Sequence, residues 1–270
     1  MSVSSFLPGC LLRRLPLSLL LAALLCASPV MARDQAPPSG AALVADARDS
    51  APEDVADAQE VPAAQRPVLP PHAAAPEAAV AACLDGDTLK LTSRRTVRLA
   101  GIDTPEMGRR GKQPQYYARE ARELLNELSR GQDVVLYQPS DKQQDKYGRL
   151  IADVCLPDGR SLNALMLEAG AAFFYPHADL DPDYQAWLKS LQATAIHERR
   201  GMWAWLLTQP VALKSYTGNK ESRRFFPAAS PDAQRIKPRN RVHFGTLMDA
   251  FLAGYAPVRR TNPWPDAEEK

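Results

Sequence analysis

The sequence predicts a mainly β protein with helices (α+β), built on a five-stranded Greek-key barrel of the OB type with about three helices. Five short strand-like segments with turn residues between them favour a small closed barrel. A helical pattern between the third and fourth segments, and two more after the fifth, fit the same class. The 24 Pro gather outside this region, which indicates a folded core with poorly ordered flanks.

The expected strands are short apolar or β-branched runs. Asp85-Gly86 and Arg94-Arg95 supply the breaks between the first three. The five runs cover residues 79–84, 88–93, 96–101, 133–138 and 150–156.

Three helices are expected, at residues 115–130, 161–169 and 182–200. The first has apolar residues on one face at spacings of three and four, and Gly131 follows its end. Gly170 stops the second. Asp181 suits the N-cap of the third, Pro182 its first turn and Gly201 its C-terminal cap.

The flanks divide the chain into four parts. Residues 1–32 are expected to be a secretory signal peptide, with Arg13-Arg14 before an apolar run and small residues before the cleavage site. Residues 33–77 have no apolar period and predict a disordered linker, with structure starting near Ala78. Residues 78–207 form the folded domain. Residues 208–270 form a basic extension with net charge +5, and their regular pattern fades except for a helix-like period at 243–255.

Composition excludes several classes of protein. The 14 Gly are too few for collagen, and four Cys in 270 residues are too few for a disulfide-rich scaffold. Signal cleavage would leave only Cys83 and Cys155, and the sequence leaves open whether they pair. The chain is expected to be exported, periplasmic or secreted, and monomeric, with no stable membrane span after cleavage.

Carboxylates and arginines gather at the ends of the expected strands. Asp87 and Asp103, with a Thr104 oxygen, could supply part of the oxygen shell of a divalent cation. Glu106 could act as general base or orient a water molecule. Arg98 and Arg149 could clamp a phosphate through paired N–H groups. Each motif alone also occurs as a turn, a cap or a surface charge, but this order along the chain points to phosphodiester hydrolysis.

Taken together, these motifs resemble the staphylococcal nuclease (thermonuclease) family over about residues 78–207. The matching segments are Asp85-Gly86-Asp87-Thr88, Val97-Arg98-Leu99, Ile102-Asp103-Thr104-Pro105-Glu106, Asp145-Lys146-Tyr147-Gly148-Arg149 and Gly201-Met202-Trp203. The resemblance implies an OB barrel and a calcium-dependent nuclease that hydrolyses DNA and RNA with little sequence specificity.

The resemblance also implies residue roles. Asp87, Asp103 and Thr104 would bind Ca²⁺, and Asp85 would be a nearby carboxylate. The catalytic residues would be Arg98, Glu106 and Arg149. The alternatives are a non-catalytic OB module that binds nucleic acid and an envelope adaptor that acts through its tails.

Two further features remain open in the sequence. The loop at 107–114 carries Arg109, Arg110 and Lys112, which could hold a nucleic-acid backbone or simply be solvated. Tyr175 and Tyr184 could stack on a base or belong to the core.

Overall fold

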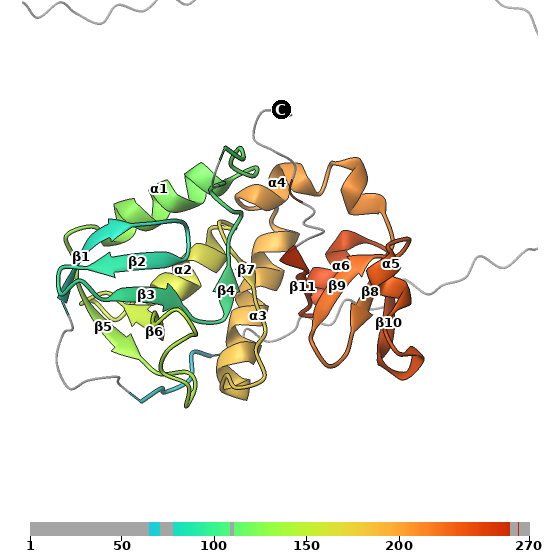
Figure 1. Ribbon diagram of the computed structural model, residues 1–270. Coiled ribbons are helices and arrows are strands. Elements are labelled where there is room, and N and C mark those ends of the chain that lie inside the picture. The colour runs from blue at the N-terminus through green and yellow to red at the C-terminus, as the bar shows by residue number, and fades with distance from the viewer. Residues whose placement is uncertain (1–64, 71–77, 109–110, 260–263, 265–270) are drawn as a thin grey trace, which may run out of the picture. The chain divides into compact units, whose positions relative to one another are not determined.

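The computed structural model describes residues 65–70, 78–108, 111–259 and 264 (Figure 1). The expected signal peptide and most of the expected linker lie outside these residues. No helix in the described part of the chain has the length and apolar character needed to cross a membrane.

Five strands close into a barrel, which confirms the predicted fold class. They are β1 (Ala78–Cys83), β2 (Thr88–Leu91), β3 (Thr96–Leu99), β5 (Asp133–Tyr137) and β6 (Leu150–Cys155). Their order around the barrel is β1-β2-β3-β6-β5. The β3–β6 pair is parallel and the other pairs are antiparallel, so the chain crosses over after β3 as a Greek key requires.

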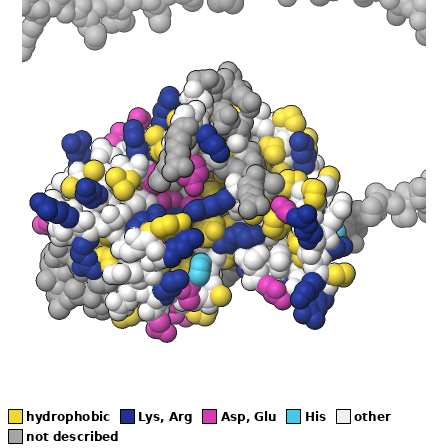
Figure 2. Space-filling view, in the orientation of Figure 1, with side chains coloured by type: hydrophobic (Ala, Val, Ile, Leu, Met, Phe, Trp, Pro, Cys, Tyr) yellow, Lys and Arg dark blue, Asp and Glu magenta, His cyan; other side chains and the backbone are white. Residues whose placement is uncertain are grey.

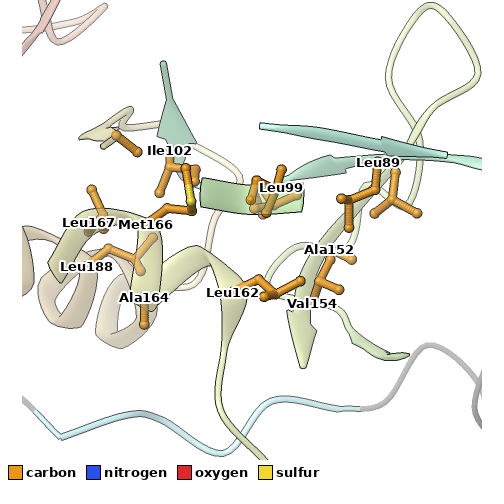
Figure 3. Packing of buried hydrophobic residues seen from close by; sticks show 14 of the residues in the cluster. Leu89, Leu99, Ile102, Ala152, Val154, Leu162, Ala164, Met166, Leu167 and Leu188 are labelled. Carbon is orange, nitrogen blue, oxygen red and sulfur yellow. The ribbon is translucent and has the colours of Figure 1, made fainter. Parts of the chain in front are cut away.

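Four helices follow or interrupt the barrel strands: α1 (Ala118–Ser129), α2 (Leu162–Glu168), α3 (Pro182–His197) and α4 (Met202–Leu206). The Asp181 side chain accepts from the Tyr184 N–H, with Pro182 in the first turn, as predicted for the third helix. Apolar side chains of the barrel and of α2 and α3 share one core, which Figure 3 shows around Leu99, Met166 and Leu188.

A short two-stranded sheet was not expected. It pairs β4 (Ile102–Asp103) with β7 (Phe173–Phe174), so that Asp103 lies opposite Phe173. Gln192 on α3 accepts from the Phe174 N–H at 2.7 Å and donates to the Phe251 carbonyl at 2.9 Å. This buried amide therefore connects the strand pair that holds Asp103 to the C-terminal part of the chain.

The C-terminal extension is folded. It contains η1 (Pro210–Leu213), β8 (Tyr216–Asn219), β9 (Arg224–Pro227), α5 (Pro231–Gln234), η2 (Pro238–Asn240), β10 (Arg241–Phe244), α6 (Leu247–Leu252) and β11 (Ala256–Pro257). Its sheet has the order β10-β8-β9-β11. The helix α6 lies inside the expected 243–255 period, whereas the sheet was missed because its strands are only two to four residues long.

An aromatic core joins the extension to helices α3 and α4. Trp203 on α4 meets Phe251 on α6 with ring centroids 4.9 Å apart, and Phe225 meets Phe251 at 5.2 Å. Trp264 is buried between Phe173 and Trp203. A chain cut after Leu207 would expose this core. Single side-chain replacements therefore test the extension's role better than truncation does.

Residues 65–70 pack on the barrel, which differs from the expected start of structure near Ala78. Leu69 is buried in the barrel core, and Arg66 forms an ion pair with Asp153 at 2.9 Å. The question of a disulfide is also answered, because Cys83 and Cys155 are both free thiols. Burial, followed by the charge of Asp153, raises the pKa of Cys155 to about 12, so this thiol stays protonated at neutral pH.

Candidate active site

One open pocket of about 470 Å³ collects the residues that the sequence singled out. It lies where the β1–β2 turn, β3 and the loop after β4 meet. All six residues predicted to be catalytic or to bind metal line it: Arg98, Glu106, Arg149, Asp87, Asp103 and Thr104. The structure thus brings together in space side chains that span more than 60 positions of sequence.

The β1–β2 turn places the buried Asp87 side chain in the wall of the pocket. The Asp87 N–H donates to Asp85 Oδ1 at 3.2 Å, and the Thr104 hydroxyl donates to Asp87 Oδ2 at 3.3 Å. Gly86 allows this approach, because a Cβ there would lie 2.9 Å from the Thr104 methyl group. The Asp-Gly-Asp sequence therefore reverses the chain and also lets the β1–β2 turn pack closely against the loop after β4.

Arg98 binds two carboxylates at once. It lies on β3 opposite Thr88, and its guanidinium contacts Asp87 at 2.9 Å and Asp103 at 2.6 Å. Its side chain is largely buried, so these contacts fix the guanidinium toward the pocket. The two contacts also hold Asp87 and Asp103 close together despite their like charge.

Arg149 is positioned by its own loop. The Asp145 side chain accepts from the N–H groups of Tyr147 and Arg149 and from Arg149 Nε at 2.7 Å. The pKa of Asp145 is lowered: burial acts to raise it, but the hydrogen bonds from Arg149 outweigh that effect. Arg149 Nη1 also reaches the Thr88 hydroxyl at 3.4 Å, which leaves the outer edge of the guanidinium at the pocket.

Glu106 stands at the rim of the pocket. It follows Pro105 in the loop after β4, and its side chain is exposed. The Glu106 N–H donates to Gln115 Oε1 at 2.6 Å, which ties this loop to the segment before α1. A carboxylate so placed can accept a proton from a water molecule in the pocket.

The donor set fits a hard divalent cation. Asp87 and Asp103 converge with Thr104 on one wall, and all three offer oxygen. The described residues contain no assembled cluster of three or more His, Cys, Asp or Glu with metal-ligand geometry. Asp87, Asp103 and Thr104 would therefore supply part of a coordination shell, and the open pocket leaves room for water and substrate oxygens.

The close approach of buried carboxylates at this site destabilises the folded protein when they are ionised. Burial, followed by the charge of Asp87, raises the pKa of Asp85 from 3.8 to about 6. Burial likewise raises that of Asp87 to about 6, with Arg98 opposing and Asp103 adding to the effect. A raised carboxyl pKa means that the folded state binds the proton more tightly than the unfolded state does. The contribution of these two carboxyls to stability is therefore greatest below their unfolded pKa and is lost as the pH rises toward 6.

We therefore expect Asp85→Asn to stabilise the protein above pH 6 in the presence of a chelator. The gain should be about 1–2 kcal/mol, less than the ~3 kcal/mol of the whole shift because Asp85 is partly exposed. Below the unfolded pKa of 3.8 the gain should vanish, because the wild-type carboxyl is then protonated in both states. Denaturant unfolding at the two pH values measures the difference, and an equal effect at both would contradict the expectation.

Two residues that line the pocket, Tyr147 and Arg259, were not among the site residues predicted from the sequence. Tyr147 lies within a recognised motif, and its exposed ring lines the pocket beside Arg149. Arg259 comes from the extension and gave no local signal. Of the two aromatic candidates, Tyr184 belongs to the core, and Tyr175 has the Arg224 guanidinium 3.6 Å from its ring centroid.

The basic loop at 107–114 is only partly described. Arg109 and Arg110 lie outside the described residues, whereas Lys112 is exposed to solvent. The expectation that this loop holds a nucleic-acid backbone stays a prediction.

The region that forms this site is similar in sequence to known nucleases. The profile of a family described as staphylococcal nuclease homologues fits residues 96–205. An uncharacterized endonuclease from Escherichia coli O157:H7 is 35% identical over 124 residues, covering 45% of this chain and 72% of the relative. Endonuclease YhcR from Bacillus subtilis is 25% identical over 223 residues, covering 74% of this chain and 18% of the relative. A probable staphylococcal-like nuclease, CAN1, from Oryza sativa is 32% identical over 114 residues, covering 42% of this chain and 30% of the relative.

Proposed function

Because the chain belongs to the staphylococcal nuclease family and is a phosphodiester-hydrolysing nuclease, we propose that it is calcium-dependent and cleaves both DNA and RNA with little sequence specificity. The observation that carries this proposal is the convergence of Arg98, Arg149 and Glu106 on one pocket whose wall holds Asp87 and Asp103. We further propose that the protein is exported to the periplasm or the medium and acts as a monomer.

The arginines would bind the phosphate to be cleaved. Arg98 and Arg149 present N–H groups to the pocket from β3 and from the loop before β6, so a phosphate between them would accept hydrogen bonds from both. Negative charge grows on the phosphoryl oxygens during attack, and fixed guanidinium groups stabilise that charge without rearranging.

Glu106 would remove the proton from the attacking water. The water oxygen forms a bond to phosphorus, its proton passes to the Glu106 carboxylate, and the bond from phosphorus to the leaving sugar oxygen breaks. Arg149 would hydrogen-bond that leaving oxygen, which takes up a proton from solvent as it departs. Asp87, Asp103 and Thr104 would hold the cation, which neutralises phosphate charge and lowers the pKa of water when bound.

Little sequence specificity is expected from this pocket. The residues proposed to contact substrate are arginines and carboxylates, which recognise phosphate and water rather than base edges. Tyr147 offers a ring face, and every base can stack on such a face.

Assays with controlled metal content test the proposal. Purified protein should cut plasmid DNA and single-stranded RNA with Ca²⁺, lose activity in a chelator and regain less with Mg²⁺. A Ca²⁺-dependent rise in melting temperature should accompany activity and be lost in Asp87→Asn. Full cleavage in a chelator would overturn the metal dependence, and cleavage of one polymer only would overturn the breadth of substrate. Binding of single strands with no cleavage would favour the non-catalytic OB module.

A further inference from the structure

The extension returns to the active-site pocket at its C-terminal end. β11 pairs with β9 in parallel, with Ala256 opposite Arg224, and the Val258 N–H donates to the Phe225 carbonyl at 3.1 Å. Trp264, five residues after Arg259, is buried in the aromatic core. Arg259 therefore lies between two segments that are fixed to the fold, β11 and Trp264.

Arg259 lies beside the proposed catalytic residues. Its Nη2 is 4.0 Å from Asp103 Oδ1, and its side chain lines the same pocket as Arg98 and Arg149. It also lines an adjoining cavity of about 60 Å³ with Glu106 and Val258, and neither Arg98 nor Arg149 lines that cavity. Arg259 also lines a second adjoining cavity, of about 170 Å³, together with Arg98, Arg149 and Tyr175. It therefore adds a third arginine at the point where the pocket continues toward Tyr175 and the extension.

The guanidinium of Arg259 is suited to an external anion. A separation of 4.0 Å is too long for a hydrogen bond, and the side chain is 62% exposed. Asp103 already has a much shorter contact with the buried Arg98. Arg259 is therefore not needed to hold Asp103, and its N–H groups can turn to a phosphate in the pocket.

Other cations continue from the pocket onto the extension. Arg224 on β9 lies over the Tyr175 ring and donates to the Pro176 carbonyl at 3.1 Å. Figure 2 shows Lys and Arg side chains, in dark blue, across the middle of the face that includes both the barrel and the extension. A polynucleotide leaving the pocket in this direction would pass along positive charge.

We propose that Arg259 binds a backbone phosphate next to the one that is cleaved, so that the extension makes the site prefer polynucleotides to single phosphodiesters. This inference rests on the proposed nuclease function and adds a substrate-binding residue from outside residues 96–205, which match the nuclease family. A dinucleoside monophosphate has only the phosphate to be cleaved and so offers no neighbouring phosphate for Arg259 to bind.

Kinetics of Arg259→Ala on two substrates test the proposal. For a long single-stranded oligonucleotide, kcat/KM should fall by about 10-fold, the effect of one lost charge-assisted hydrogen bond, and the loss should lie in KM. For the dinucleoside monophosphate, kcat/KM should be unchanged. Arg259→Lys, which keeps the charge but not the fork of donors, should lose less. Arg239→Ala is the matched control, since it removes one exposed charge from the same extension without lining these pockets.

A binding measurement separates this inference from the nuclease proposal. Fluorescence anisotropy of a labelled oligonucleotide in a chelator should show weaker binding to Arg259→Ala than to wild type, with a salt slope smaller by about one. If wild type cleaves nothing, the nuclease proposal fails, and the anisotropy still decides for or against Arg259. Equal losses on both substrates would place Arg259 on the cleaved phosphate, and no loss on either would remove it from the substrate. Both results would overturn the proposal.

Discussion

Replacing Glu106 with Gln should lower phosphodiester hydrolysis by about 100-fold or more, the usual scale for loss of a general base. The amide keeps the size of the side chain but cannot accept the proton of the attacking water. Substrate KM should change little, because Arg98 and Arg149, which are proposed to hold the phosphate, are untouched. Single-turnover rates at saturating substrate measure the chemical step directly.

The fold should be unaffected by Glu106→Gln, since the side chain is exposed and the Gln115 contact uses the backbone N–H. The melting temperature and its rise with Ca²⁺ should match those of wild type. Glu127→Gln, an exposed change of the same kind on α1, serves as the control and should keep full activity. A folded Glu106→Gln protein with nearly wild-type rates would contradict the role of Glu106 as a base.

The barrel and its site could be predicted from the sequence because their signals are local. Turn residues such as Asp85-Gly86 separate the strands, and the apolar face of α1 repeats at helical spacing. The site residues stand at strand ends, where closing the barrel brings them together. Their arrangement around Arg98 depends on register, so the double contact to Asp87 and Asp103 could not be read from spacing.

The extension could not be predicted because long-range contacts hold it together. Its strands are too short to show a period of two, and Phe225, Phe251 and Trp264 are stabilised by rings far away in sequence. Its fading regular pattern predicted a poorly ordered flank, whereas the structure buries its aromatic residues against α3 and α4. Arg259 reaches Asp103 across more than 150 positions, a relation that no local motif encodes.

Residues 65–70 are also held by contacts distant in sequence, which local sequence patterns do not reveal. Ala- and Pro-rich composition predicted a linker through residue 77, and composition gives no sign of one specific ion pair. The Asp153 carboxylate is fully buried and accepts hydrogen bonds from Arg66, Ser161 and Tyr184. Arg66 also lies near the rings of Tyr137 and Trp187. This segment therefore belongs to the folded domain.

Arg66→Met should destabilise the protein by about 2–4 kcal/mol, because it leaves the buried charge of Asp153 without its cation. The lower part of that range allows for solvent around Arg66, whose side chain is 32% exposed. A loss of this size should lower the melting temperature by roughly 5–15 °C for a domain of this length. A chain that begins at residue 78 should lose at least as much relative to one that begins at residue 64, since it also removes Leu69 from the core.

A double-mutant cycle isolates the charge from the packing. Asp153→Asn keeps an oxygen acceptor for Ser161 and Tyr184 but removes the buried charge, so Arg66→Met should cost much less in that background. Arg160→Met is the matched control: its ion pair with Asp158 is exposed on both sides and should contribute little. If Arg66→Met costs the same with Asp153 and with Asn at that position, the segment is held by packing alone. If it costs nothing in either background, Arg66 does not stabilise the barrel, and only the packing of Leu69 would hold this segment.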